Sequence, residues 1–184
     1  MSMWQAYLED MTFSFRKQKE MTEQAISQLD DEEFFRRPGE HSNGVAAIVK
    51  HLAGNLRSRW ADFLTGDGDK PWRDRDAEFV VGPQDTREGL LAAWREGWDT
   101  LFGTLASLSE GDLLKRVTIR GEEHTVLQAL GRGLTHAAYH AGQILYVARL
   151  VRKGEWRWVT IAPGQSRQFK AEKRPYLKGE EGQP

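Results

Sequence analysis

The chain has 184 residues, of which 39% are hydrophobic and 29% are charged, and its formal net charge is −1. This balance is typical of one soluble globular domain and excludes the concentrated basic surface that nucleic-acid binding requires. The sequence contains no cysteine, which excludes disulfides, thiolate metal ligands and a cysteine nucleophile.

The N-terminal segment lacks the uninterrupted apolar core of a signal peptide, because Glu9, Asp10, Arg16 and Lys17 break it up. No run in the sequence approaches the roughly 20 apolar residues of a membrane-spanning helix. We therefore expect a cytoplasmic protein with neither a membrane nor a nucleic acid as partner.

Hydrophobic residues recur at three- and four-residue steps in four long segments, which predicts four helices. Pro38 and Gly39 separate the first from the second, and Ser42 or Asn43 is the expected N-cap of the second. Thr125 with Gln128 resembles a capping box before the last helix. The predicted helices cover residues 3–29, 42–64, 84–108 and 126–152.

The segments between these helices carry two further predictions. The polar stretch 66–83 is long for a compact domain, and long loops are often functional. Within it, we interpret residues 70–76 as a solvated surface loop, with a lid or anion-binding role as the alternative. Its acidic residues are expected to pair with Arg57 and Arg59. Val117 and Ile119 alternate with polar residues before Gly121, which predicts a short β-hairpin. The single domain is expected to span residues 1–170, and residues 171–184 to form a flexible tail.

Two of the five histidines, His136 and His140, lie four residues apart on the last predicted helix. This spacing places both imidazoles on one helix face, where they can bind one ion. His51 on the second helix has small neighbours such as Gly54, which leave space for another helix. A lone histidine is more often a surface or hydrogen-bonded residue, so the pair carries the metal hypothesis. His41 and His124 are expected outside the site, the latter solvated.

Three histidines leave coordination positions open for water or substrate, as catalytic metal sites do. Asn55 lies one turn after His51 and is a candidate to contact substrate or to pack as a buried amide. Gln143, three residues after His140, is a candidate to orient an imidazole, although helix packing is the simpler reading. No residue stands out as a general base; the helix-one acids Glu9 and Asp10 are candidates for a fourth ligand or for a base.

The stretches IVKHLAGN (48–55) and HAAYHAGQI (136–144) resemble the DinB-like superfamily, which includes YfiT-type metal-dependent hydrolases and bacillithiol and mycothiol S-transferases. Residues 56–60 and 67–73 resemble most closely its DUF1572 branch. The resemblance extends over about residues 3–170. It implies an all-α, up-down-down-up four-helix bundle, to which we add the short hairpin before the last helix.

The resemblance also implies that His51, His136 and His140 bind one divalent metal ion, with zinc or nickel expected first, and that the protein is a homodimer. Many members have Arg directly after the last histidine, where this chain has Ala141. From the three histidines and the resemblance together, we expect a metal-dependent enzyme acting on a small molecule, either a thiol transferase or a hydrolase. The alternative is a non-enzymatic dimeric binding or stress-response module whose metal is structural or sensory.

Overall fold

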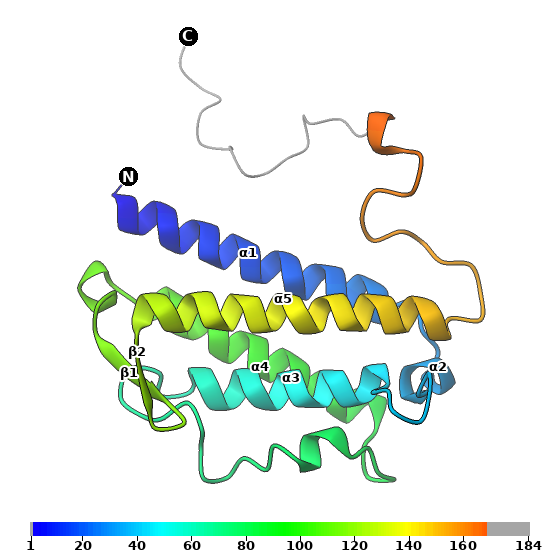
Figure 1. Cartoon of the computed structure of the whole chain (residues 1–184), viewed down its shortest axis with the longest axis horizontal. Helices are drawn as coiled ribbons and strands as arrows, with labels where there is room; N and C mark the ends of the chain where they lie inside the picture. The colour runs from blue at the N-terminus through cyan, green and yellow to red at the C-terminus, as the bar shows by residue number, and fades with distance from the viewer. Residues whose placement is uncertain (1, 169–184) are drawn as a thin grey trace.

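Four long helices and a two-stranded hairpin dominate the computed structural model, which describes residues 2–168 (Figure 1). No helix in this described range combines the length and apolar character needed to cross a membrane. The tail expected at residues 171–184 lies outside the described residues. The long helices are α1 (Met3–Ile26), α3 (Val45–Trp60), α4 (Arg87–Ser107) and α5 (Val126–Val151), the strands are β1 (Arg116–Ile119) and β2 (Glu122–Thr125), and the short helical turns are α2 (Asp31–Phe35), η1 (Ala77–Phe79), η2 (Glu110–Asp112) and η3 (Ser166–Gln168).

Helices α3 and α4 pack closely and run in the same direction. A Cβ on Gly97 of α4 would lie 3.0 Å from the carbonyl oxygen of Ala53 in α3. Seven residues further along both helices, the Thr104 hydroxyl donates a hydrogen bond to the carbonyl oxygen of Trp60 at 2.8 Å. Because α3 and α4 are parallel, the chain between them must return along the length of the molecule, as Figure 1 shows.

Helix α5 runs antiparallel to α3 and lies beside α1, which has the same direction as α5 (Figure 1). At one end of the α3–α5 contact, a Cβ on Gly133 would lie 2.6 Å from Cζ2 of Trp60, so glycine is what allows the indole to fit. About two helical turns away on both helices, the rings of His51 and His140 have centroids 4.8 Å apart. The antiparallel contact therefore brings the middle of α3 opposite the middle of α5.

Large aromatic side chains fill the core between the helices. Phe15 of α1 makes edge contacts with Trp60 and with Trp98 of α4, with ring centroids 6.0 and 6.4 Å apart. Trp94 lies against Trp98 at 5.5 Å. All four side chains are almost completely buried, and such rings contribute much of the apolar area that stabilises a small domain.

The helix ends agree with the sequence for α5 and differ for α3. Thr125 and Gln128 form the predicted capping box. Helix α3 begins after Gly44 rather than Ser42 or Asn43, and ends at Trp60, four residues before the predicted end. Gly44 is still extended, and a Cβ there would lie 2.7 Å from the carbonyl oxygen of Arg36. Packing of the preceding loop against Gly44 therefore delays the start of the helix.

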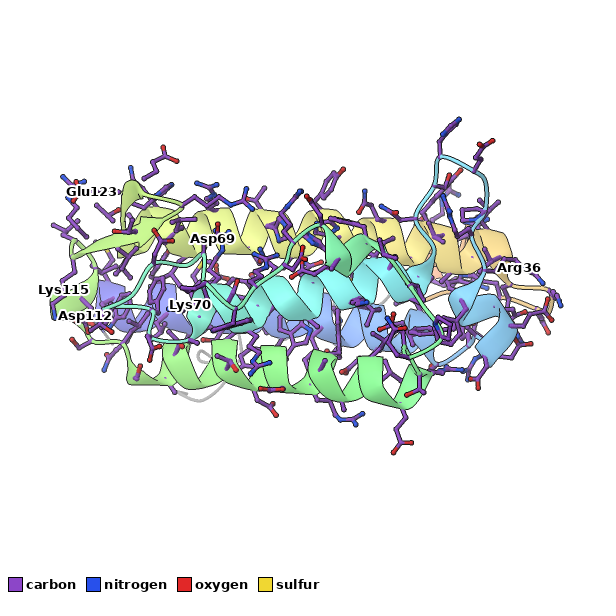
Figure 2. The ribbon with its side chains drawn as sticks, turned by 90° about the horizontal axis from the view of Figure 1, so that it is seen from below. Arg36, Asp69, Lys70, Asp112, Lys115 and Glu123 are labelled. Atoms are coloured by element: carbon purple, nitrogen blue, oxygen red, sulfur yellow. The ribbon has the colours of Figure 1, made fainter. Side chains whose placement is uncertain are left out.

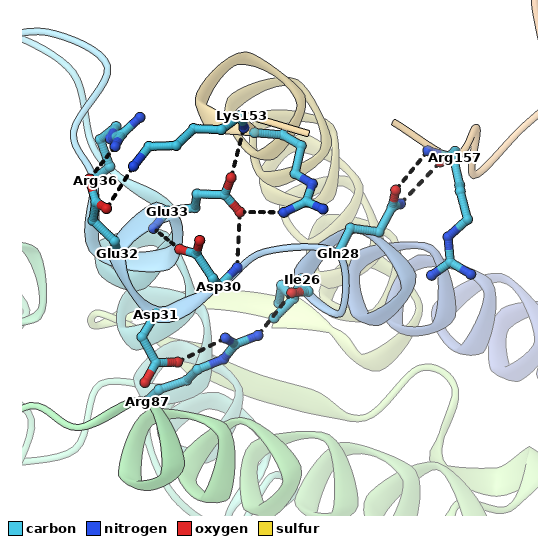
Figure 3. A network of polar contacts seen from close by, with 11 residues as sticks. Ile26, Gln28, Asp30, Asp31, Glu32, Glu33, Arg36, Arg87, Lys153 and Arg157 are labelled. Carbon is cyan, nitrogen blue, oxygen red and sulfur yellow. Dashed lines mark hydrogen bonds and ion pairs between the residues drawn. The ribbon is translucent and has the colours of Figure 1, made fainter. Parts of the chain in front are cut away.

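The short helix α2 was not predicted, although its capping signal is present in the sequence. Asp30 and Glu33 form a capping box around its first turn. Glu33 is fully buried, and its carboxylate also accepts hydrogen bonds from the Lys153 backbone N–H at 2.7 Å and from Arg152 at 2.8 Å (Figure 3). Arg87 at the start of α4 donates to Asp31 in the same region. Helix α2 thus joins the ends of α1, α4 and α5.

The hairpin is confirmed, and its turn is held by a distant carboxylate. Arg120 and Gly121 both have positive φ, 57° and 74°, as a two-residue hairpin turn of type I′ requires. Asp67, from the chain after α3, accepts hydrogen bonds from both of their backbone N–H groups, at 2.9 and 2.8 Å. The neighbouring Asp69 and Lys70 lie toward the hairpin end of the molecule (Figure 2). The connection after α3 therefore fixes the position of Arg120.

Candidate metal centre

Three histidines from two helices converge in the middle of the molecule. His51 projects from α3, and His136 and His140 project from consecutive turns of α5. One ring nitrogen from each lies within 4.8 Å of the others, and Nε2 of His136 is 3.2 Å from Nε2 of His140. His51 and His140 are buried, and His136 is partly buried. The three residues proposed from the sequence are close enough together to bind one ion.

A buried carboxylate orients His51. Glu78, from the turn η1, lies with Oε2 2.8 Å from Nδ1 of His51. Arg73 donates two hydrogen bonds to the same carboxylate, at 2.7 and 2.9 Å. Burial alone would raise the pKa of Glu78, but the hydrogen bonds from Arg73 and His51 outweigh it and hold the pKa below its ordinary value. The ionised carboxylate can only accept, so Nδ1 of His51 carries the proton and Nε2 keeps its lone pair.

Two neighbours of His51 and Glu78 make this arrangement fit. Phe79 stacks on the His51 ring, with centroids 4.5 Å apart and planes 24° from parallel. Gly54 lies one turn after His51, and a Cβ there would be 2.2 Å from Oε1 of Glu78. The space expected beside His51 exists, and the carboxylate of Glu78 fills it.

Gln143 holds the second histidine. Nδ1 of His140 donates to Oε1 of Gln143 at 2.8 Å, which leaves Nε2 of His140 facing His136. Carboxylate or carbonyl partners on the far nitrogen are how proteins fix the tautomer of metal-binding histidines. This hydrogen bond is the contact expected of Gln143 if it orients an imidazole, as one of the two interpretations from the sequence has it.

Burial keeps the α5 histidines neutral. Burial first, and then the neighbouring charge of His140, lowers the pKa of His136 to about 3. Burial and then the charge of His51 lower the pKa of His140 to about 4. Metal binding requires imidazole in its neutral form. Both rings therefore have a free lone pair at neutral pH without having to release a proton.

A cavity of about 440 Å³ opens beside the three rings. Its size is that of a small-molecule site. Asn55 lines it, is only 6% exposed, and its side-chain amide has no hydrogen-bond partner within residues 2–168. The remaining lining includes Arg59, Arg75, Phe79, Arg120, Arg132 and Tyr139.

The other candidates from the sequence lie elsewhere. His41 is in an exposed turn, and Glu9 and Asp10 are on the exposed face of α1. His124 is in β2 as predicted but is not solvated, since its side chain is only 12% exposed and its Nε2 accepts a hydrogen bond from Arg132 at 2.8 Å. The carboxylate of the site comes from Glu78 instead.

Glu78, Arg73 and Phe79 were missed because they belong to the polar stretch 66–83, in which residues 70–76 were interpreted as a solvated surface loop. That interpretation was wrong for Arg73. The side chains of Arg73 and Glu78 are only 3% and 9% exposed. The available signal in the sequence was the pair Glu78-Phe79, an acid followed by a large aromatic residue within a polar segment. The search for histidines at helical spacing does not detect such a pair.

The three imidazoles fit a divalent transition metal, since one nitrogen of each lies within 4.8 Å of the others and two of their far nitrogens are already hydrogen-bonded. Fold and site thus define a helical protein with a three-histidine candidate metal centre beside a small-molecule cavity. Residues 2–165 match the model of the family described as "Protein of unknown function (DUF1572)", and the chain belongs to this family. No curated protein and no solved structure shows a significant match to the chain.

Proposed function

We propose that this protein is a metal-dependent enzyme in which His51, His136 and His140 bind one divalent ion, zinc or nickel in the first instance. The observation that carries the proposal is the convergence of three imidazoles, within 4.8 Å of one another, on a cavity of small-molecule size. Because three side chains do not saturate such an ion, positions remain for substrate. The reaction is a thiol transfer or a hydrolysis.

The ion would supply Lewis-acid activation of a thiol or a water molecule. The protein's own residues supply the rest. Arg73 and Glu78 fix the His51 ring, and Gln143 fixes the His140 ring. Asn55, whose amide faces the cavity, is placed to hydrogen-bond a bound substrate. Glu78 is fully engaged by Arg73 and His51, so its role is to position His51 rather than to transfer a proton.

We also propose that the helices form the up-down-down-up bundle of the DinB-like superfamily, over a single domain of residues 1–170. Parallel packing of α3 and α4, with α5 antiparallel to α3, supports this order. Ala141, which stands where many members of that superfamily have Arg, is buried at 1% exposure. A substrate contact from that position is therefore not part of the proposal.

Turnover assays with the metal-loaded protein test the enzymatic proposal. Zinc-, nickel- and cobalt-loaded samples would be assayed with low-molecular-weight thiols plus electrophilic acceptors, and with ester and amide substrates. The expected result is turnover that is lost in His136→Ala and retained in His41→Ala, which removes an exposed histidine outside the site. Absence of turnover with every substrate class and every ion would contradict the enzymatic proposal.

The alternative, a dimeric module with a structural or sensory metal, is favoured by one surface feature. Tyr139, Tyr146 and Leu150 on α5 are 62%, 71% and 58% exposed and recur at helical spacing. An exposed apolar stripe of this kind marks interaction surfaces, and a homodimer through α5 would cover it. Cobalt spectra distinguish the two functions. Exchangeable water on the ion supports the enzyme, and a ligand-saturated ion supports the module.

A further inference from the structure

The cavity beside the histidines is strongly positive on one side. Four arginines line it, and no aspartate or glutamate appears among the described residues that do. The chain as a whole has a net charge of only −1, so the overall composition does not account for this concentration. The four are Arg59, Arg75, Arg120 and Arg132.

Arg59 is the most informative of the four. It is only 8% exposed, and its side chain has no hydrogen bond and no ion pair with any residue the structure describes. We expected both Arg57 and Arg59 to pair with acidic residues of the 66–83 stretch. Within residues 2–168, Arg59 forms no such ion pair, and Arg57 pairs instead with Glu96 of α4, at 3.2 Å. A buried charge without a partner is costly. A ligand that brings the missing negative charge would remove this cost.

Arg120 and Arg132 are held near Arg59 by their own elements. Arg120 occupies the hairpin turn fixed by Asp67, and within residues 2–168 its guanidinium forms an ion pair with Asp69 alone, at 3.6 Å. Arg132 lies one turn before His136 on α5. Its partners are His124 and Glu122, the latter at 3.5 Å and 71% exposed. These acids lie at the surface, so they compensate the arginines weakly.

The mutual effect of these charges is visible in Arg59. Burial, followed by the charges of Arg132, Arg73 and Arg120, lowers the pKa of Arg59 to about 10, and the charge of Asp69 opposes this only in part. The guanidinium is still protonated at neutral pH, so the positive charges coexist and repel one another. An anion between them would replace repulsion with charge-assisted hydrogen bonds.

The arginines are in line with the histidines. On α3, His51, Asn55 and Arg59 follow at four-residue steps, and on the antiparallel α5 the order is His140, His136, Arg132. Both helices therefore place a histidine in the middle and an arginine toward the hairpin end. The backbone offset between the histidines and the arginines is about one to two helical turns, or roughly 6–12 Å.

We propose that the hairpin end of the cavity binds the carboxylate or phosphate group of the substrate through Arg59, Arg120 and Arg132, while the rest of the substrate reaches the three histidines. This substrate class applies to the proposed enzyme. Only the reaction at the histidines rests on the proposed function; anion binding by the arginines does not. The substrate is a small organic acid or phosphate ester whose reacting group lies a few bonds from its anionic end.

Anion binding is measured apart from catalysis and apart from the metal. Chelator-treated, dialysed full-length protein would be titrated with inorganic phosphate and with succinate by calorimetry and thermal unfolding, and metal content would be assayed on separate samples. The expected result is saturable binding that Arg59→Met weakens by about tenfold to a hundredfold. The matched control is Arg95→Met, which removes an exposed arginine of α4 and should leave binding unchanged. Tighter binding of succinate assigns a carboxylate, and tighter binding of phosphate assigns a phosphate.

A second readout is the unfolding temperature, measured first without any anion and then with phosphate. Because Arg59 is buried without a partner, Arg59→Met should unfold at the same temperature as the wild type or higher when no anion is present, and should lose the stabilisation by phosphate. A lower unfolding temperature without anion, or equal anion binding by wild type and Arg59→Met, would overturn the proposal. Failure of anion binding with normal metal uptake would refute this inference alone. Normal anion binding without metal uptake would refute the proposed function alone.

Discussion

Oε2 of Glu78 lies 2.8 Å from Nδ1 of His51, although the two residues are separated by 27 positions and come from a 3-10 turn and a helix. The contact fixes which nitrogen of His51 is protonated and turns Nε2 toward His136 and His140. Arg73 in turn neutralises the buried carboxylate. The long connection between α3 and α4 is therefore part of the site, since it supplies the residues that prepare His51 to bind a metal.

Replacing Glu78 by glutamine tests this relationship. The amide keeps nearly the same size but loses the charge that strengthens the hydrogen bond from His51, so we expect metal affinity to fall by about 10–100-fold. Competition with a chromophoric chelator measures the affinity. Glu88→Gln, at an exposed position of α4, is the control. Equal affinities for Glu78→Gln and wild type would show that the carboxylate does not assist binding.

Gly54→Ala tests the same contact by sterics. A Cβ at this position would lie 2.2 Å from Glu78, so the methyl group should displace the carboxylate and weaken metal binding. Gly103→Ala is the matched control, because its Cβ would have nothing within 4 Å. In that variant helix propensity acts alone and should stabilise the fold by up to about 1 kcal/mol. Chemical denaturation and chelator competition on both variants separate the two effects.

The α3–α5 contact predicts a loss of stability in Gly133→Ala. The new Cβ would lie 2.6 Å from Trp60 Cζ2, and an indole buried to 1% exposure has little room to move. Overpacking of this kind costs about 1–3 kcal/mol. Gly131→Ala, two residues earlier on α5 and with nothing within 4 Å, should not be destabilised. Urea unfolding of the pair gives the comparison, and similar losses in both would argue against the close contact.

Glu33 predicts acid sensitivity outside the site. Hydrogen bonds from the backbone of Lys153 and of Asp30, opposed by burial and helped by Arg152, lower its pKa from 4.5 to about 2. The pKa of Glu33 is lower in the folded protein than in the unfolded chain. The stabilisation by its carboxylate is therefore fully present above pH 4.5 and is lost as the pH falls toward 2. The difference in unfolding free energy between wild type and Glu33→Gln should therefore shrink over that interval. A difference that stays constant from pH 7 to pH 2 would contradict this assignment.

Local signals in the sequence were sufficient for much of the fold. Periodicity located the four long helices, Thr125 with Gln128 located the start of α5, and Val117, Ile119 and Gly121 located the hairpin. The same kind of signal existed for α2 in Asp30 and Glu33, but five residues are too few for a hydrophobic period to develop. The start of α3 was misplaced because the position of Gly44 depends on packing against Arg36, a tertiary contact.

The candidate metal site was likewise predictable from the sequence only in part. The four-residue spacing of His136 and His140 is visible in the sequence because a regular helix converts spacing into a shared face. His51 was proposed from its small neighbours and supported by the resemblance, since spacing alone does not reveal which faces of two helices meet. Glu78 and Arg59 were out of reach for a physical reason. The role of each depends on the path of an irregular connection, which decides that Glu78 is buried beside His51 and that no acid within residues 2–168 forms an ion pair with Arg59.

Metal stoichiometry tests the central claim most directly. Untagged protein freed of chelator would be incubated with zinc, nickel and manganese, dialysed, and analysed for metal by elemental analysis, alongside His51→Ala, His136→Ala and the control His41→Ala. The account predicts close to one divalent ion per chain in the wild type and in His41→Ala, and loss of the ion in both site variants. A wild-type protein that retains none of these ions, or site variants that retain as much as the wild type, would contradict it.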